Sequence, residues 1–270
     1  MSLILCRREP AAHPLYIEKL GVHIYSAQEL CYVICQYPLL AMDGFVDDRL
    51  REFVADGLQM GFLAMKMEKT ARGGGSDEEI LMMILQECGY CSAAEIGKYK
   101  QQLAGYRKMR REEYEKATAD FYYSLGQYRA AIDKYQEILD RGRLNLMDDE
   151  FAARLWSNIG ASYAGMFWFE RAMHAYEMSY GLSKSEDTVK RMYQLTLFAP
   201  KLAVKERYQS LITADMAAKW AAEVEEFKES ACGTDEVQEV VLMFQKDPLK
   251  RAAACERKLG GWKKAYRAMV

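Results

Sequence analysis

The chain has 270 residues, of which 50% are hydrophobic and 12% aromatic, and this composition allows one large or two modest domains and excludes wholesale disorder. Lysine and arginine (37) nearly balance aspartate and glutamate (39), so the overall charge gives no argument for binding nucleic acid or an anionic membrane. No apolar run approaches the roughly 18 residues of a membrane span, and we expect neither a span nor a secretory signal. Seven scattered cysteines suit a reducing compartment, so we expect a cytoplasmic protein.

Residues 1–110 are expected to form an N-terminal helical region after an irregular or extended start. The stretch "LYIEKLGVHIY", residues 15–25, has the composition of a short strand. Three serines, each followed three residues later by glutamate, form capping boxes: the serine side chain accepts the third helical N–H, and the glutamate accepts the serine N–H. The helices that these boxes predict begin after Ser26, Ser76 and Ser92.

A further helix is predicted over residues 46–70, where apolar residues recur at helical spacing, although Gly57 and Gly61 weaken the pattern. The side chains expected to face the core are Leu50, Phe53, Val54, Leu58 and Phe62. The following "RGGGS", residues 72–76, predicts a flexible turn between two helices. It does not have the Lys-Ser/Thr ending or the preceding strand of a phosphate-binding loop.

Residues 111–270 carry a repeated pattern of small and aromatic side chains. In its first copy the residues that carry the pattern are Ala119, Tyr122, Gly126, Tyr128, Ala131 and Tyr135. In its second copy they are Trp156, Ile159, Gly160, Tyr163, Phe169, Ala172 and Tyr176. The pattern predicts pairs of antiparallel helices, because small side chains let two helices approach closely while the rings fill the gaps one turn away.

Over residues 112–183 this pattern resembles the tetratricopeptide repeat (TPR), and the remainder of the chain resembles it less. Phe167 departs from the family, which usually has glycine at this turn. A third, degenerate pair of helices is expected to start near Glu186. A terminal helix is expected to start at Pro248, and Gly260–Gly261 is expected to form the turn of a capping hairpin. The resemblance implies an all-α fold: a short right-handed TPR-like superhelix (residues 111–270) after the N-terminal helical region (residues 1–110).

In the TPR family the first helix of each pair lines a concave groove that holds a peptide. The residues of this chain at the matching positions are Lys116, Asp120, Tyr123, Ser157, Asn158, Ala161, Lys190 and Arg191. Some family members hold a peptide C-terminal carboxylate with lysine, asparagine and a further basic residue, which Lys116, Asn158 and Lys190 or Arg191 resemble. Asp120 departs from this pattern, because a carboxylate repels an incoming carboxylate, and an ordinary solvated helix face is the alternative interpretation.

Two further surface features are candidates for contact with a partner. Tyr123 and Trp168 lie off the core spacing, which predicts either exposed anchors or packing against additional helices. The C-terminal stretch from Lys250 to Arg267 is rich in basic residues and includes Trp262, which is compatible with RNA, an anionic membrane or an acidic protein. A terminal helix that caps the stack with solvated lysines explains it as well, and we expect no nucleic-acid partner.

The spacing of Cys88 and Cys91 (Cys-Gly-Tyr-Cys) is that of a zinc-binding or redox pair. Zinc needs four ligands, and a second Cys/His pair with matching spacing is missing. The candidates for a composite site are Cys31 and Cys35, four residues apart on a helix, with Cys6, His13 and His23 upstream. Reduced cysteines in a helical core are the alternative, and we expect neither a metal nor another cofactor.

No catalytic motif accompanies these residues, and the three histidines do not cluster in the sequence. We therefore expect a non-catalytic protein–protein interaction module that binds a protein or peptide partner or associates with a second copy as a homodimer. A peptide- or ligand-responsive regulator and a cysteine-based metal or redox protein are the alternatives.

Overall fold

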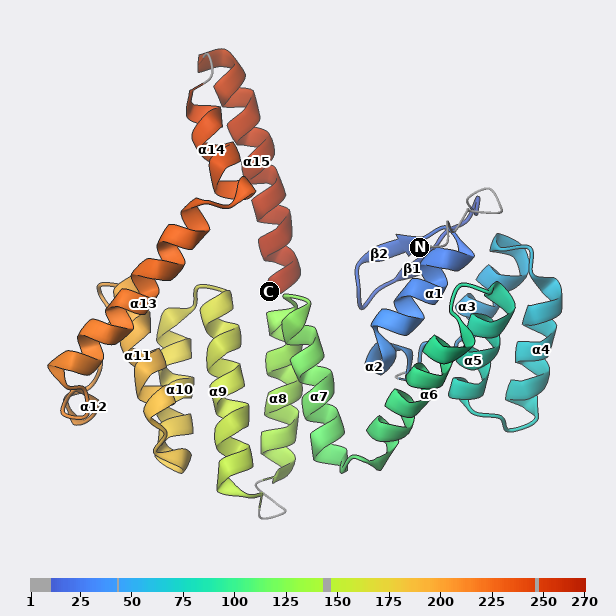
Figure 1. Ribbon diagram of the computed structural model, residues 1–270, viewed down its shortest axis with the longest axis horizontal. Coiled ribbons are helices and arrows are strands. Elements are labelled where there is room, and N and C mark those ends of the chain that lie inside the picture. The colour runs from blue at the N-terminus through green and yellow to red at the C-terminus, as the bar shows by residue number, and fades with distance from the viewer. Residues whose placement is uncertain (1–10, 43, 143–146, 246–247) are drawn as a thin grey trace. The chain divides into compact units, whose positions relative to one another are not determined.

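The computed structural model describes residues 11–42, 44–142, 147–245 and 248–270 (Figure 1). These residues are mostly helical, and their only sheet has two short strands, so the predicted all-α class is confirmed. The chain divides into two compact units, Met1–Thr118 and Ala119–Val270, which we call the N-terminal and the C-terminal unit. This boundary lies within helix α7 (Arg111–Ser124), whereas the sequence predicts a boundary after residue 110.

The N-terminal unit begins with an antiparallel hairpin of two strands, in which Leu15 pairs with Ile24 and Ile17 with Val22. The predicted single strand is therefore a pair, joined by a turn at Gly21 with φ +66°. The elements of this unit are β1 (Leu15–Ile17), β2 (Val22–Ile24), α1 (Ala27–Gln36), α2 (Pro38–Ala41), α3 (Asp48–Glu52), the π-helical turn η1 (Phe53–Gly57), α4 (Gly61–Arg72), α5 (Asp77–Cys88) and α6 (Ala93–Lys108).

All three predicted capping boxes are confirmed, at the starts of α1, α5 and α6. At Ser26, for example, the side chain accepts the N–H of Glu29 (3.2 Å), and the Glu29 carboxylate accepts the N–H of Ser26 (3.2 Å). Helix α5 packs between α1, α4 and α6. The largest fully buried side chains of this unit are Ile24, Leu30, Ile34, Leu50, Met67, Ile80, Leu81, Ile84, Leu85 and Leu103.

The continuous helix predicted over residues 46–70 is wrong, because a π-helical turn and a break divide it. The N–H of Leu58 bonds to the carbonyl of Phe53 (2.8 Å), five residues back, and Gln59 follows with φ +55°. Each such insertion shifts the residues that follow around the helix axis. Leu63 is consequently buried, whereas Phe62, which was expected to face the core, is 65% exposed.

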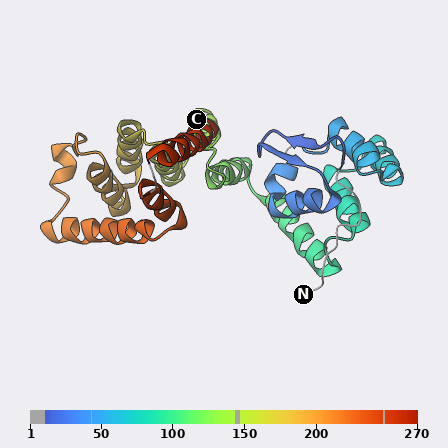
Figure 2. The same cartoon turned by 90° about the horizontal axis from the view of Figure 1, so that it is seen from above.

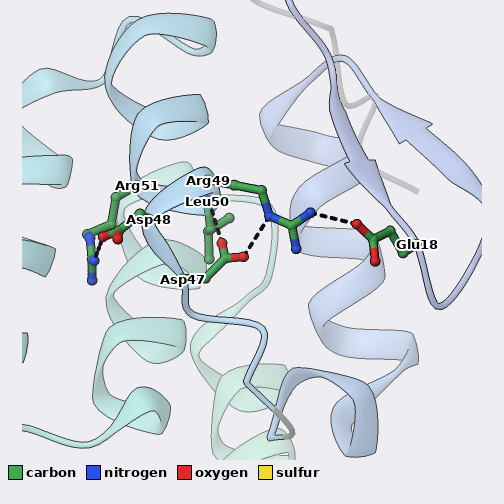
Figure 3. A network of polar contacts seen from close by, with 6 residues as sticks. All are labelled: Glu18, Asp47, Asp48, Arg49, Leu50 and Arg51. Carbon is green, nitrogen blue, oxygen red and sulfur yellow. Dashed lines mark hydrogen bonds and ion pairs between the residues drawn. The ribbon is translucent and has the colours of Figure 1, made fainter.

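The start of α3 is tied to the turn that follows β1 (Figure 3). The Asp47 side chain caps α3 by accepting the N–H of Leu50 (2.9 Å), and Arg49 donates to both Asp47 (2.9 Å) and Glu18 (2.9 Å). Burial opposes the charge on Asp47, but the Leu50 N–H and the Arg49 guanidinium hold its pKa below the ordinary value. Asp47 therefore remains a charged cap over the physiological pH range.

The C-terminal unit consists of successive helices that run in alternating directions from α7 to α11 (Figure 1), and Figure 2 shows them from above. After α7, its helices are α8 (Tyr128–Gly142), α9 (Asp149–Gly165), α10 (Phe169–Ser183), α11 (Glu186–Phe198), α12 (Glu206–Gln209), α13 (Ala214–Cys232), α14 (Asp235–Phe244) and α15 (Pro248–Met269). One buried cluster lies among α7, α8, α9 and α10, and a second among α10, α11, α12 and α13. None of the helices in the described residues is both long and apolar enough to cross a bilayer.

The small side chains that were predicted to allow close helix contacts are all buried. Ala119, Ala131 and Ala172 have no exposed surface. Gly160 on α9 lies against the ring of Tyr176 on α10, so that a Cβ atom at residue 160 would be 2.6 Å from the ring. The short distance between α9 and α10 at this level therefore depends on the absence of a side chain.

The turns that join α7 to α8 and α9 to α10 have the same hydrogen bonds, 41 residues apart. In the first turn, Gln127 N–H bonds to Tyr122 O (3.0 Å), and Gly126 has φ +71°. In the second, Trp168 N–H bonds to Tyr163 O (2.9 Å), and Phe167 has φ +63°. Phe167 thus adopts the left-handed conformation that favours glycine, at a cost of about 1–2 kcal/mol for a residue with a Cβ atom.

The turn predicted at Gly260–Gly261 is wrong, because α15 continues through both glycines. Each glycine costs a helix only about 1 kcal/mol relative to alanine, and the alanine, lysine and arginine residues on both sides favour the helix. The terminal hairpin is instead made by α14 and α15, which contact each other and are linked by an ion pair between Glu239 and Lys258. We call α14 and α15 the C-terminal hairpin.

Candidate functional site

Three polar side chains from α7, α8 and α9 form a half-buried network within the C-terminal unit. The hydroxyl of Tyr135 donates to Asp120 Oδ1 (2.6 Å). The amide of Asn158 donates to the same oxygen (2.9 Å) and to the Tyr135 hydroxyl oxygen (3.3 Å). Burial, together with the bond to Asp120, raises the pKa of Tyr135 well above its ordinary value, so its hydroxyl stays protonated and donates to Asp120.

This network changes the interpretation of the predicted carboxylate-binding donors. The Asn158 amide is directed at Asp120, and Lys190 forms an ion pair with Glu223 on α13 (2.5 Å). Lys116 lies on α7. The Asn158 amide and the Lys190 ammonium are thus bonded to carboxylates of the chain itself, and Arg191 is the other basic candidate on α11.

Arg191 lies half-buried between its own helix and α10. Its Nε donates to Asp187 Oδ2 (2.8 Å), one turn earlier on α11, and its guanidinium also hydrogen-bonds the Tyr176 hydroxyl. Burial raises the pKa of Tyr176, while the positive charge of Arg191 acts against this increase. A guanidinium has five N–H donors, so these two contacts do not use its full hydrogen-bonding capacity.

A pocket of about 310 Å³ opens beside Arg191, near the turn that joins α9 to α10. Its wall is mainly apolar and aromatic, with Arg191 and Gln194 as its polar side chains. The lining residues are Ala164, Phe167, Phe169, Tyr176, Arg191, Gln194, Leu195 and Phe198. A second pocket of about 390 Å³ shares Phe167 and Phe169 and continues to Arg171, Lys201 and Leu202.

The remaining predicted groove residues lie on the same helices. Tyr123 on α7 is partly exposed, with its ring 5.3 Å from that of Tyr128, and Ser157 and Ala161 are half-buried on α9. The structure therefore brings Asp120 and Asn158 together at the Tyr135 hydroxyl, and Arg191 lines the same pocket as Tyr176.

Trp168 packs within the C-terminal unit. Its ring stacks on Tyr163 at 5.9 Å between centroids, with the Arg171 guanidinium 4.6 Å from the ring. The indole N–H donates to the Tyr266 hydroxyl of α15 (2.9 Å). Of the two interpretations predicted for Trp168, the structure favours packing against an additional helix.

The aromatic residues that line the pocket were not predicted as a site. Phe167 was noted in the sequence only as a departure from glycine at a turn, and it is 69% exposed. Phe198 lies at the end of α11, outside the clear repeats, and no spacing rule marks it. A bulky residue where the turn needs a positive φ is the one sequence signal that points to this region.

Over the part of the chain that the structure describes, no three His, Cys, Asp or Glu side chains are arranged to hold a metal ion. Cys88 and Cys91 each contact a cysteine of α1.

Comparisons of the chain with protein-family models, with curated proteins and with solved structures found no match.

Proposed function

We propose that this chain is a non-catalytic, cytoplasmic protein–protein interaction module, in which helices α7 to α11 form a TPR-like array. The support is the pair of turns with matching hydrogen bonds 41 residues apart, and the buried small side chains beside aromatic rings. A regular array of helical hairpins presents the same face of each first helix on one side. Peptides and helices bind to such faces through a few anchoring side chains.

The observation that carries the proposal is the pocket beside Phe167 and Arg191. Phe167 combines a costly left-handed backbone with an exposed ring, and such strain is typical of positions kept for function. The pocket has the volume and the apolar lining of a site for one large side chain. The ligand that fits is a peptide that inserts an apolar side chain and places a carboxylate near Arg191.

The test starts from a random peptide library displayed with free C-termini, selected on the purified chain. Phe167→Gly is expected to weaken binding of the enriched peptides at least about tenfold, because it removes an aromatic anchor. Its fold is expected to persist, since relief of the left-handed strain offsets the lost ring contact with Phe169. Arg191→Met is expected to weaken the binding of peptides that end in a free carboxylate more than it weakens the binding of the corresponding C-terminal amides.

Phe227→Ala, at an exposed phenylalanine of α13 outside the pocket, is the matched control and should bind like the wild type. Dissociation constants from isothermal titration calorimetry, with circular dichroism as the check of folding, decide the result. Enriched peptides that bind Phe167→Gly and wild type equally would contradict the proposed pocket.

The C-terminal hairpin favours a second mode of association, with another copy of the chain. Of the described side chains of α14 and α15, only Met243 is buried, whereas Phe244 is 60% and Trp262 51% exposed. Charge is separated along this part: residues 214–244 have eight acidic and two basic side chains (net −6), and residues 248–269 have seven basic and one acidic (net +6). Two copies that pair antiparallel would place α15 of each beside the acidic helices of the other and cover these rings.

We therefore predict that the chain forms a dimer that Val241→Asp with Phe244→Asp converts to a monomer. Both residues are exposed on α14, so the substitutions add charge to the proposed contact without entering a core. Phe62→Asp, at an exposed phenylalanine of the N-terminal unit, is the control and should leave the dimer intact. Sedimentation velocity checks this, and a wild-type chain that sediments as a 31.0 kDa monomer at all soluble concentrations would refute the dimer.

A further inference from the structure

Four cysteines from two distant parts of the N-terminal unit come together where α1 meets the end of α5. Cys31 and Cys35 lie one turn apart on α1, and Cys88 is the last residue of α5. Cys91 follows in the short turn before α6. None of the four forms a disulfide, and electrostatic interactions link Cys31 to each of the other three.

The thiols are arranged as two pairs. Cys35 Sγ and Cys91 Sγ are 3.1 Å apart, and Cys31 hydrogen-bonds Cys88. In a tetrahedral zinc site, Zn–S bonds of about 2.3 Å would hold the sulfur atoms about 3.8 Å apart. The Cys35–Cys91 contact is shorter than that, and no three His, Cys, Asp or Glu side chains of the described residues are arranged to hold a metal ion. This geometry favours a bond between two sulfurs over a shared metal ion.

Local structure fixes the position of Cys91 relative to α1. Gly89 caps the C-terminal end of α5, and its φ of +62° turns the chain. Ser92, directly after Cys91, begins the capping box of α6 and accepts the N–H of Glu95 (3.3 Å). Cys91 thus lies between two fixed points, and the disulfide bond length of about 2.05 Å requires its sulfur and that of Cys35 to approach by only about 1 Å.

We propose that Cys35 and Cys91 are an oxidative modification site that hydrogen peroxide or an organic hydroperoxide converts to a disulfide. With hydrogen peroxide, one oxygen atom is transferred to the Cys91 thiol, which becomes a sulfenic acid, and one water molecule is released. The Cys35 sulfur then attacks the Cys91 sulfur, the S–O bond breaks, and the hydroxyl group leaves as water with the Cys35 proton. Two thiols lose two hydrogens in total, and one peroxide is reduced to two waters.

The surroundings of Cys35 make it the thiol that reacts second. Burial and the contact with Cys91 raise the pKa of Cys35 to about 12, so at neutral pH it is almost wholly protonated and a poor nucleophile. The titratable groups around it are Cys31 on the same helix, Tyr90 and Cys91 in the turn, and Glu95 and Tyr99 on α6. None of these groups is cationic, so disulfide formation is expected to be slow at pH 7 and to accelerate as the pH rises.

The experiment uses the reduced full-length chain with Cys6, Cys232 and Cys255 replaced by serine. After hydrogen peroxide, the remaining thiols are alkylated and the digest is analysed by mass spectrometry. The expected result is a peptide pair joined through Cys35 and Cys91, lighter by two hydrogens and separated again by dithiothreitol. The closed loop of 56 residues should also raise the melting temperature of the N-terminal unit by several degrees.

Matched variants separate this site from its neighbours. Cys88→Ser should retain the cross-link, because the 3.1 Å contact joins Cys35 to Cys91, whereas Cys91→Ser should abolish it. Exclusive linkage of Cys31 to Cys88, or no linked peptide once all accessible thiols have reacted, would overturn the proposal. Stoichiometric zinc in the purified chain, found by elemental analysis together with thiols that resist peroxide until a chelator is added, would also overturn it.

Discussion

Replacing Gly160 with alanine is expected to destabilise the C-terminal unit by about 2 kcal/mol, because the added methyl group would be placed inside the Tyr176 ring contact. The new Cβ atom would lie 2.6 Å from one carbon of the Tyr176 ring and within 3.0 Å of two other ring carbons. The ring cannot easily move, since it is buried in the cluster formed with α11 and α13. Alanine favours a helix by about 1 kcal/mol over glycine, and the clash outweighs this gain.

Gly181→Ala is the matched control for this prediction. Gly181 lies on α10, the same helix as Tyr176, and a Cβ atom there would meet nothing within 4 Å. The helix preference of alanine then acts alone, so we expect a gain of about 0.5–1 kcal/mol. Urea unfolding followed by circular dichroism measures both variants. If Gly160→Ala were as stable as Gly181→Ala, this would contradict the claim that α9 and α10 are too close at Gly160 to hold a side chain.

The elements that can be predicted from the sequence are those that depend on neighbouring residues. Ser26 and Glu29 form a capping box through bonds that span three residues, so their spacing contains the whole interaction. Gly160 and Tyr176 are further apart, but both belong to a pattern that recurs 41 residues earlier at Ala119 and Tyr135, and this recurrence makes the pattern visible in the sequence. Where local chemistry and repetition agree, the structure follows the prediction.

The errors arise where an element depends on a specific backbone event or on a distant partner. The π-helical turn at Phe53–Gly57 inserts into a pattern that otherwise has helical spacing, and the burial of Leu63 in place of Phe62 is its consequence. The two glycines of α15 are a turn signal that flanking helix formers override.

Distant partners limited the prediction of the candidate site in the same way. Asn158 matches a ligand-binding position by spacing, but its hydrogen bonds lead to Asp120 and Tyr135, which lie 38 and 23 residues away in the chain. Cys35 and Cys91 meet across 56 residues, and their spacing carries no trace of that contact. The identity of such partners is a property of the packed helices and not of the local pattern.

Substituting Asp120 with alanine is expected to cost about 3 kcal/mol, because one carboxylate oxygen accepts from both Tyr135 and Asn158. Hydrogen bonds to a charged group contribute about 1.5–3 kcal/mol each, and a buried hydroxyl that loses its acceptor adds a desolvation penalty. Asp120→Asn retains an acceptor oxygen without the charge, and its cost should be near 1 kcal/mol. Tyr135→Phe should cost about 2 kcal/mol.

A double-mutant cycle separates the network from the individual residues. Once Asp120 is alanine, Tyr135→Phe no longer breaks a charged hydrogen bond, so its cost should fall by at least about 1 kcal/mol. Equal costs in both backgrounds, measured by urea unfolding, would show that the two residues act independently.

Asp120→Asn also tests the proposed function, because it removes the one carboxylate of the network while the hydrogen-bonded arrangement around Asn158 persists. Peptides with a free C-terminus should therefore bind this variant more tightly than the wild type, and their amides should bind both equally.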